Sequence, residues 1–337
     1  MASFGNIVCH FRWKNGTSIF TMVDQIASAE TCRACGALLN KDQFQLGELC
    51  SVCAEAGSQA SFDNALGSPP VDFAPGVQQQ AAPDPDRPTW GFASGVGVWV
   101  ASVAAIILIP IVAVIAWYFI ESARGAKPPT FSDQTELIEW LKSPNLLLVQ
   151  VLSTIVAHAI TIGICWLVVT RMGARPFWAS LGWHWAGHSI WYWLAFSVCV
   201  ILGLLLASQL LARVLPQSEE NSFTELLKSS QRVRIAIAVL ATFTAPFVEE
   251  AVYRGVLYAG LRKNFGLTTT VVFVTLMFVG VHVLQYLGAW VTIAGLTLLS
   301  LALTVIRART KSILPCVAIH TVNNAFFSVL ILFNKVT

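Results

Sequence analysis

The chain has 337 residues, of which 55% are hydrophobic and only 12% are charged. Soluble domains carry about 25% charged residues, so this composition excludes an ordinary soluble protein because too little polar surface remains to face water. The formal net charge of +3 is too small to indicate a nucleic-acid-binding protein, and we expect no nucleic-acid partner.

The N-terminal region is polar and contains three predicted parts. Residues 1–29 match no pattern and stay unassigned, and Lys14 and Asp24 interrupt any secretory signal there. Residues 30–57 contain four closely spaced cysteines. Residues 58–93 are rich in proline, glutamine and small polar residues, which predicts a flexible linker because such a composition cannot bury a core.

The four cysteines stand as two Cys-x-x-Cys pairs separated by fourteen residues, namely Cys32, Cys35, Cys50 and Cys53. This spacing is typical of a structural zinc site, and a segment this short needs the metal to fold. Two disulfides, a redox pair and bound iron are alternatives, although a cytoplasmic location disfavours disulfides. We predict a zinc ribbon with structural Zn²⁺, which could recruit a cytoplasmic protein partner.

The remainder of the chain is predicted to form about seven transmembrane helices. A bilayer core requires about 20 apolar residues of helix, and open backbone cannot face lipid. The fold class is therefore an all-α polytopic membrane protein, preceded by the small ribbon and the linker. Residues 94–234 supply the N-terminal helices and residues 235–333 the C-terminal core. The seven apolar segments are 95–120, 146–170, 189–212, 235–260, 268–287, 289–306 and 314–333.

Basic residues gather in every second connection between these segments. They are Arg171 and Arg175, then Arg262 and Lys263, then Arg307, Arg309 and Lys311. The positive-inside rule places those connections, the N-terminus and the ribbon in the cytoplasm. Because ribbons on membrane proteins are typical of bacteria, we expect a bacterial inner membrane.

Ionisable residues lie at membrane depth in the fourth segment, where each is a functional-site hypothesis because its burial is costly. Glu250 and Arg254 are four residues apart, share a helix face and can pair. Glu249 is rotated by about 100° from Glu250 and has no local cation. A carboxylate left unpaired in an apolar helix suits a general base or acid.

Two further segments carry polar side chains at the same spacing. Phe278 and His282 are four residues apart in the fifth segment, as are His320 and Asn324 in the seventh. Three helices therefore point such pairs toward a common interior. Interhelical hydrogen bonding alone is the alternative, and we favour it only for the isolated His158.

The motifs Glu249-Glu250-x-x-x-Arg254, Phe278-x-x-x-His282 and His320-x-x-x-Asn324 resemble, in order, the three motifs of the CPBP family. This family is named for CAAX proteases and bacteriocin-processing enzymes and is also called Abi. The resemblance covers about residues 235–333 and implies an intramembrane endopeptidase. The implied substrates are membrane-embedded or lipidated proteins or peptides in the lipid bilayer.

The resemblance also implies roles for the motif residues. Glu249 and His282 would activate the attacking water, and His320 and Asn324 would stabilise the oxyanion. Glu250, Arg254 and Phe278 would support the shape of the site. An older description of the family as metalloproteases implies a metal on the glutamates and histidines, and we favour a mechanism without a catalytic metal.

Two other functions remain open from the sequence. The first is a non-proteolytic binding or immunity protein of the same fold. The second is a proton-coupled transporter that uses Glu249 and the histidines as titrating groups. Replacing Glu249 by alanine separates these hypotheses, because only a peptidase would lose the cleavage of a membrane peptide.

Overall fold

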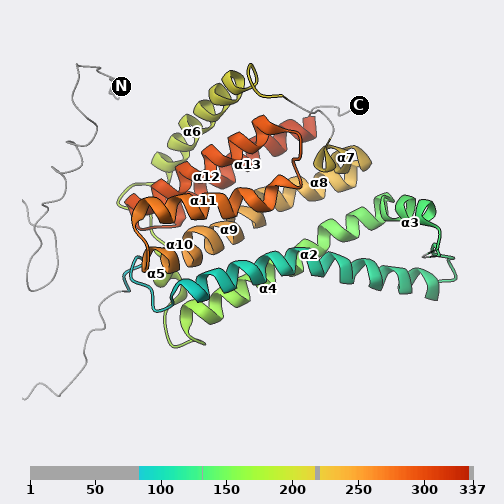
Figure 1. The fold of residues 1–337 in the computed structure, drawn as a ribbon, viewed down its shortest axis with the longest axis horizontal. Helices are drawn as coiled ribbons and strands as arrows, with labels where there is room; N and C mark the ends of the chain where they lie inside the picture. The colour runs from blue at the N-terminus through green and yellow to red at the C-terminus, as the bar shows by residue number, and fades with distance from the viewer. Residues whose placement is uncertain (1–82, 131, 217–220, 334–337) are drawn as a thin grey trace, which may run out of the picture. The chain divides into compact units, whose positions relative to one another are not determined.

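The computed structural model describes residues 83–130, 132–216 and 221–333. The described elements are helices, as the sequence predicts (Figure 1). The four cysteines of the predicted zinc ribbon, the N-terminal extension and most of the predicted linker lie outside the described residues.

Within these ranges, six helices are long and apolar enough to cross a membrane, so the chain is an integral membrane protein. Many of their large apolar side chains are exposed, as a lipid-facing surface requires. The six spans are α2 (Phe92–Ala123), α4 (Pro144–Thr170), α6 (Ile190–Leu211), the composite helix Gln231–Arg262, α12 (Trp290–Thr310) and α13 (Leu314–Phe333).

The remaining predicted segment folds as the shorter helix α11, Leu267–Val283, which has 17 residues. A turn of residues 284–289 joins α11 to α12, with Gly288 at a φ of 87°. The expected hairpin between these two helices is therefore present, but its first arm ends earlier than predicted.

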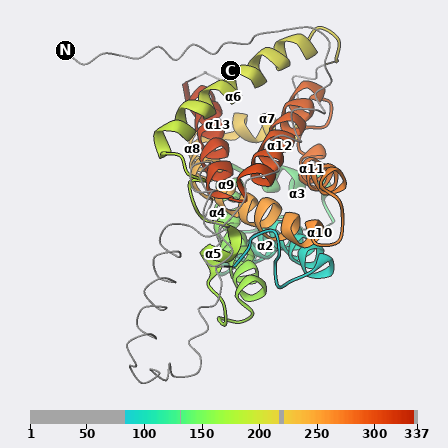
Figure 2. The same cartoon turned by 90° about the vertical axis from the view of Figure 1, so that its left-hand side faces the viewer.

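Successive long helices run in opposite directions, and α2 lies along α4 (Figure 1). Helix α13 packs against α6, α8, α9 and α12, and α11 packs against α12 (Figure 2). The alternation brings the basic connections after α4, α10 and α12 to the same end as the start of α2 (Figure 1). The loop pattern that predicted the orientation thus corresponds to one end of the helical bundle.

The fourth span is interrupted twice by π-helical turns. Pro246 cannot donate a backbone hydrogen bond, and the chain widens into a π-turn directly before it, since π-turns absorb such breaks. A second π-segment follows Glu250 directly, so the two glutamates lie between the widened turns. The successive pieces are α8 (Gln231–Val239), η2 (Leu240–Thr244), α9 (Ala245–Glu250), η3 (Ala251–Leu257) and α10 (Tyr258–Arg262).

Three short helices complete the described elements. Asp133 caps α3 through its side chain, and Asn221 caps α7 in the same way. These elements are α3 (Gln134–Leu141), α5 (Phe177–Leu181) and α7 (Ser222–Ser229).

The most continuous burial lies around η3 and α10, where residues 251–261 are all buried. This region packs against α2 at very short range, because a Cβ atom added to Gly260 would lie 2.8 Å from the carbonyl oxygen of Gly91. Close backbone approach at small residues is a common means of packing membrane helices. The core therefore forms around the same stretch of chain that follows the two glutamates.

Residues 83–91, which we call the strap, were predicted as the end of the linker but pack against the bundle. Trp90 is only 6% exposed, and its indole Nε1 donates to the carbonyl oxygen of Val256 at 2.9 Å. Arg171 also donates to the carbonyl oxygen of Thr89 at 3.0 Å. Residues that precede the first span thus contact η3 of the fourth span.

Candidate active site

Glu250 lies at the centre of a buried polar network. Its Oε1 atom accepts from Nη1 of Arg254 at 2.8 Å and contacts Nδ1 of His320 at 2.8 Å. The side chains of Glu250 and Arg254 are fully buried, and that of His320 is 4% exposed. The predicted pairing of Glu250 with Arg254 is present, and the pair holds a histidine from a different helix.

The contact with Glu250 fixes the orientation of the His320 ring. An ionised carboxylate can only accept, so Nδ1 carries a proton and Nε2 is the ring atom left for other chemistry. Nε2 lies 3.8 Å from Oε2 of Glu249. The neighbouring glutamates therefore flank one imidazole, with Glu250 at Nδ1 and Glu249 at Nε2.

Glu249 differs from Glu250 in its access to solvent, because its side chain is 26% exposed. Its carboxylate is close enough to interact electrostatically with His158, Tyr253 and Tyr286. Tyr286 lies in the turn between α11 and α12, where burial and then the charge of Glu249 raise its pKa to about 12. Glu249 is thus the accessible carboxylate of the pair, as a general base must be.

The aromatic ring of Phe278 connects the residues of the three motifs. Its centroid lies 4.8 Å from that of His282 and 6.1 Å from that of His320. The guanidinium carbon of Arg254 lies 4.9 Å from the centre of the same ring, within cation–π range. Nδ1 of His282 contacts the carbonyl oxygen of Phe278 at 2.8 Å. Because a carbonyl only accepts, the neutral ring of His282 keeps Nε2 as an acceptor.

Asn324 is bound to the first π-helical segment. Its Nδ2 donates to the carbonyl oxygen of Ala241 at 2.9 Å, and its Oδ1 accepts from Nδ2 of Asn323 at 3.2 Å. Within the described part of the chain, no direct hydrogen bond joins Glu249 to His282 or to Asn324. The fold thus brings Glu249 to His320, whereas His282 reaches His320 through the ring of Phe278.

Sequence reasoning missed two residues of α12 that hold Arg254. Nη2 of Arg254 donates to the carbonyl oxygen of Ser300 at 3.0 Å and to its hydroxyl at 2.9 Å. Arg307 was counted as a connecting residue, but it lies within α12, is fully buried and donates to the carbonyl oxygen of Arg254. A sequence signal exists, since Ser300, Thr304 and Arg307 are spaced by four and three residues on one helix face.

His158 and Asn323 also approach the site. Nδ1 of His158 lies 3.0 Å from the hydroxyl of Thr244, the last residue of η2 before α9 begins. This contact agrees with the hydrogen-bonding role favoured from the sequence, while the charge of Glu249 also reaches His158. Asn323 is 5% exposed and orients the Asn324 amide.

Among residues 83–333 that the structure describes, no group of three or more His, Cys, Asp or Glu side chains is arranged to hold a metal ion. The predicted four-cysteine zinc site lies outside these residues.

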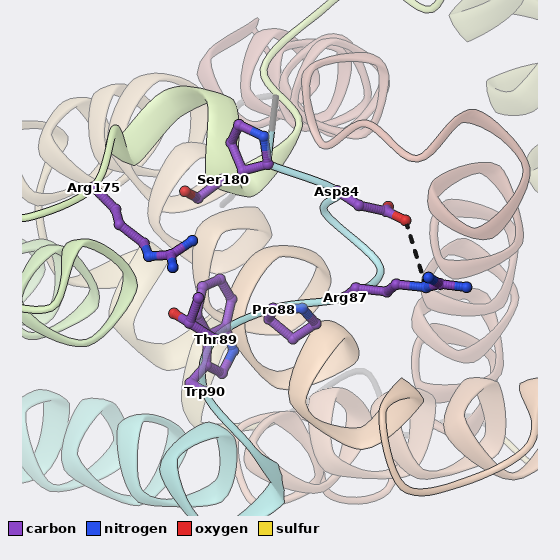
Figure 3. A pocket seen from close by; sticks show the side chains of 8 residues that line it. Asp84, Arg87, Pro88, Thr89, Trp90, Arg175 and Ser180 are labelled. Atoms are coloured by element: carbon purple, nitrogen blue, oxygen red, sulfur yellow. Dashed lines mark ion pairs between the residues drawn. The ribbon is translucent and has the colours of Figure 1, made fainter. Parts of the chain in front are cut away.

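Two cavities lie away from the motif residues. One, of about 270 Å³, opens beside the strap and is lined by Asp84, Arg87, Trp90 and Arg175 among others (Figure 3). The other, of about 400 Å³, is an apolar groove between α6 and α13 with Val198 and Phe326 in its walls. Neither is lined by a motif residue.

Comparison with known protein families bears on the same part of the chain. Residues 231–326 match the family described as Rce1-like, type II CAAX prenyl endopeptidase Rce1-like. This range is therefore similar to an Rce1-like domain. The match begins at α8 and ends within α13, so the domain contains all three motifs and both π-helical segments. No match was found among curated proteins or among solved structures.

Proposed function

We propose that this chain is an intramembrane endopeptidase that hydrolyses a peptide bond of a lipidated or membrane-embedded protein or peptide. The Rce1-like domain supports a protease acting on protein or peptide substrates. The observation that carries the proposal is the contrast between the glutamates. Glu250 is fully buried and paired, whereas Glu249 is partly exposed and lies beside Nε2 of His320.

In the proposed reaction, Glu249 accepts a proton from a water molecule with assistance from His282. The water oxygen bonds to the carbonyl carbon of the substrate, and the electron pair of the carbonyl moves to its oxygen. His320, carrying a proton on Nε2 as well as on Nδ1, and the second N–H of the Asn324 amide stabilise this oxyanion. The C–N bond then breaks, and the proton on Glu249 passes to the leaving amine.

Glu250, Arg254 and Phe278 act in this proposal as supports. The carboxylate of Glu250 holds both Arg254 and His320 at 2.8 Å, and Phe278 fills the space between the two histidines and Arg254. No step of the proposed mechanism uses a catalytic metal. The proposal also includes a zinc ribbon that holds a structural Zn²⁺ and recruits a cytoplasmic protein partner. The chain itself resides in a bacterial inner membrane, with the basic end of its helical bundle in the cytoplasm.

The test uses the full chain in lipid nanodiscs with an internally quenched peptide that carries a farnesylated cysteine near its C-terminus. Glu249→Gln keeps the shape of the side chain and removes the base, so we expect the rate to fall by about 10²-fold to 10⁴-fold. Glu225→Gln is the matched control because the Glu225 side chain is 64% exposed and lies on α7. The same peptide without the farnesyl group shows whether the lipid is recognised.

A wild-type rate in the folded Glu249→Gln variant would refute the proposal. If its biological activity were also unchanged, a binding or immunity role would be favoured. If the variant instead lost proton-coupled flux in liposomes, and wild type cleaved no peptide, the transporter would be favoured.

A further inference from the structure

The second π-helical segment, η3, is held by side chains from outside its own helix. The carbonyl oxygen of Arg254 accepts from Nε of Arg307 at 3.0 Å, and that of Val256 accepts from Nε1 of Trp90 at 2.9 Å. A π-turn replaces the usual i→i+4 hydrogen bonds with a wider and less favourable pattern. External donors to its carbonyls therefore favour the π-helical backbone over an ordinary α-helix.

Helix α12 binds both the side chain and the backbone of Arg254. Ser300 accepts from the guanidinium of Arg254 at 3.0 and 2.9 Å, and Arg307 donates to its main-chain oxygen. Ser300 and Arg307 are seven residues apart, about two helical turns, and so lie on one face. Contacts with α12 thus fix the position of both the side chain and the backbone of Arg254, and the same guanidinium pairs with Glu250.

Arg307 in turn depends on the strap. Its Nη1 donates to Oδ1 of Asp86 at 2.8 Å and its Nη2 to the carbonyl oxygen of Pro85 at 3.1 Å. Its guanidinium carbon also lies 4.8 Å from the ring centre of Tyr258. Arg307 is fully buried, and a buried cation must be paired. Asp86 supplies that charge from a segment 221 residues away in the chain, and its side chain is 21% exposed.

We propose that Asp86 of the strap and Arg307 are positioning residues for the peptidase site. The pair fixes the register of η3 and thereby the placement of Arg254 against Glu250 and His320. A one-residue change between π-helical and α-helical registers would rotate Arg254 by about 100° relative to Glu250. This inference rests on the proposed peptidase function, although the contacts that carry it are independent of the reaction.

The test compares two strap variants that undergo the same chemical change, Asp86→Asn and Asp84→Asn. Asp84 is a matched control because its ion pairs are with Arg87 (Figure 3) and Lys311, whose side chains are 89% and 57% exposed. Its Oδ1 also accepts from the backbone N–H of Asp86 at 3.0 Å, and the amide oxygen of an asparagine can accept that hydrogen bond as well. In Asp86→Asn we expect kcat to fall by about tenfold to a hundredfold, with KM little changed, since a small misplacement of catalytic groups costs this much. Asp84→Asn keeps the wild-type kcat, and Asp86→Glu recovers part of the loss.

A second readout does not depend on hydrolysis. In the full chain labelled with ¹⁵N-histidine, the Nδ1–H resonance of His320 reports its hydrogen bond to Glu250. We expect this resonance to shift in Asp86→Asn and in Trp90→Phe, which keeps an aromatic ring but removes the donor to Val256, and to stay in place in Asp84→Asn.

A kcat of Asp86→Asn equal to that of wild type, together with an unmoved His320 resonance, would overturn the inference. A loss of kcat that only matches the unfolded fraction of Asp86→Asn would overturn it as well, because the pair would then be merely structural. Failure of the proposed function has a different signature, namely full hydrolysis by Glu249→Gln, and the His320 resonance still tests the positioning role in that case.

Discussion

Replacing Arg254 by methionine removes the cation from the centre of the site while keeping much of its apolar stem. The guanidinium makes hydrogen bonds of 2.8, 3.0 and 2.9 Å to Glu250 and Ser300, and both ionic side chains are fully buried. The variant leaves Glu250 buried without its cation. Breaking one side of such a pair costs about 3–5 kcal/mol, which is the decrease that we expect in the free energy of unfolding.

The measurement is reversible unfolding of the purified chain in mixed micelles, followed by circular dichroism. Lys142→Met is the control, since its pair with Glu225 spans 3.6 Å between side chains that are 66% and 64% exposed. Exposed pairs contribute about 1 kcal/mol or less, so this variant should unfold almost as wild type does. The double variant Glu250→Gln with Arg254→Met should be more stable than Arg254→Met alone, because no uncompensated charge remains.

Two results would refute this reasoning. One is a cost for Arg254→Met no larger than that for Lys142→Met. The other is a double variant whose cost equals the sum of the two single costs, since contacting residues of one network are expected to couple.

Three further predictions concern other parts of the chain. The purified full chain should contain one zinc per molecule by elemental analysis, and Cys32→Ser should lose it; an equal zinc content would contradict the ribbon. Gly260→Leu should destabilise the protein by about 1–3 kcal/mol because its side chain would meet the backbone of Gly91, whereas the same change at Gly163, which has nothing within 4 Å, should not. Burial and the charge of Glu249 raise the pKa of Tyr286 to about 12, so between about pH 10, where an unfolded tyrosine ionises, and pH 12 the free energy of unfolding should fall with rising pH. Tyr286→Phe should remove that part of the slope.

The apolar segments and the three motifs could be predicted from sequence because both depend on local spacing. Runs of about 20 apolar residues are required by bilayer thickness, and residues four apart share a helix face whatever the tertiary structure. The pairing of Glu250 with Arg254 follows from that spacing alone. The all-helical membrane fold is confirmed on the same basis.

What could not be predicted depends on contacts between distant segments. Asp86 and Arg307 are separated by 221 residues, and nothing local distinguishes Asp86 from the other polar residues of the predicted linker. The π-turns widen a helix without changing its composition, so the periodicity of the fourth segment does not show them. The catalytic roles given to Glu249, His282, His320 and Asn324 stay predictions until the variants are measured.

Helix lengths in this molecule do not match one another. The 32 residues of α2 extend about 48 Å, whereas the 17 residues of α11 extend about 26 Å, and a bilayer core is about 30 Å thick. The bilayer must therefore thin locally beside α11, or the turn that carries Tyr286 must lie at the depth of the acyl chains. His282 is the next-to-last residue of that short helix. Lipids with short acyl chains would relieve the mismatch. The thickness of the surrounding membrane should therefore affect the position of α11, the helix that carries His282.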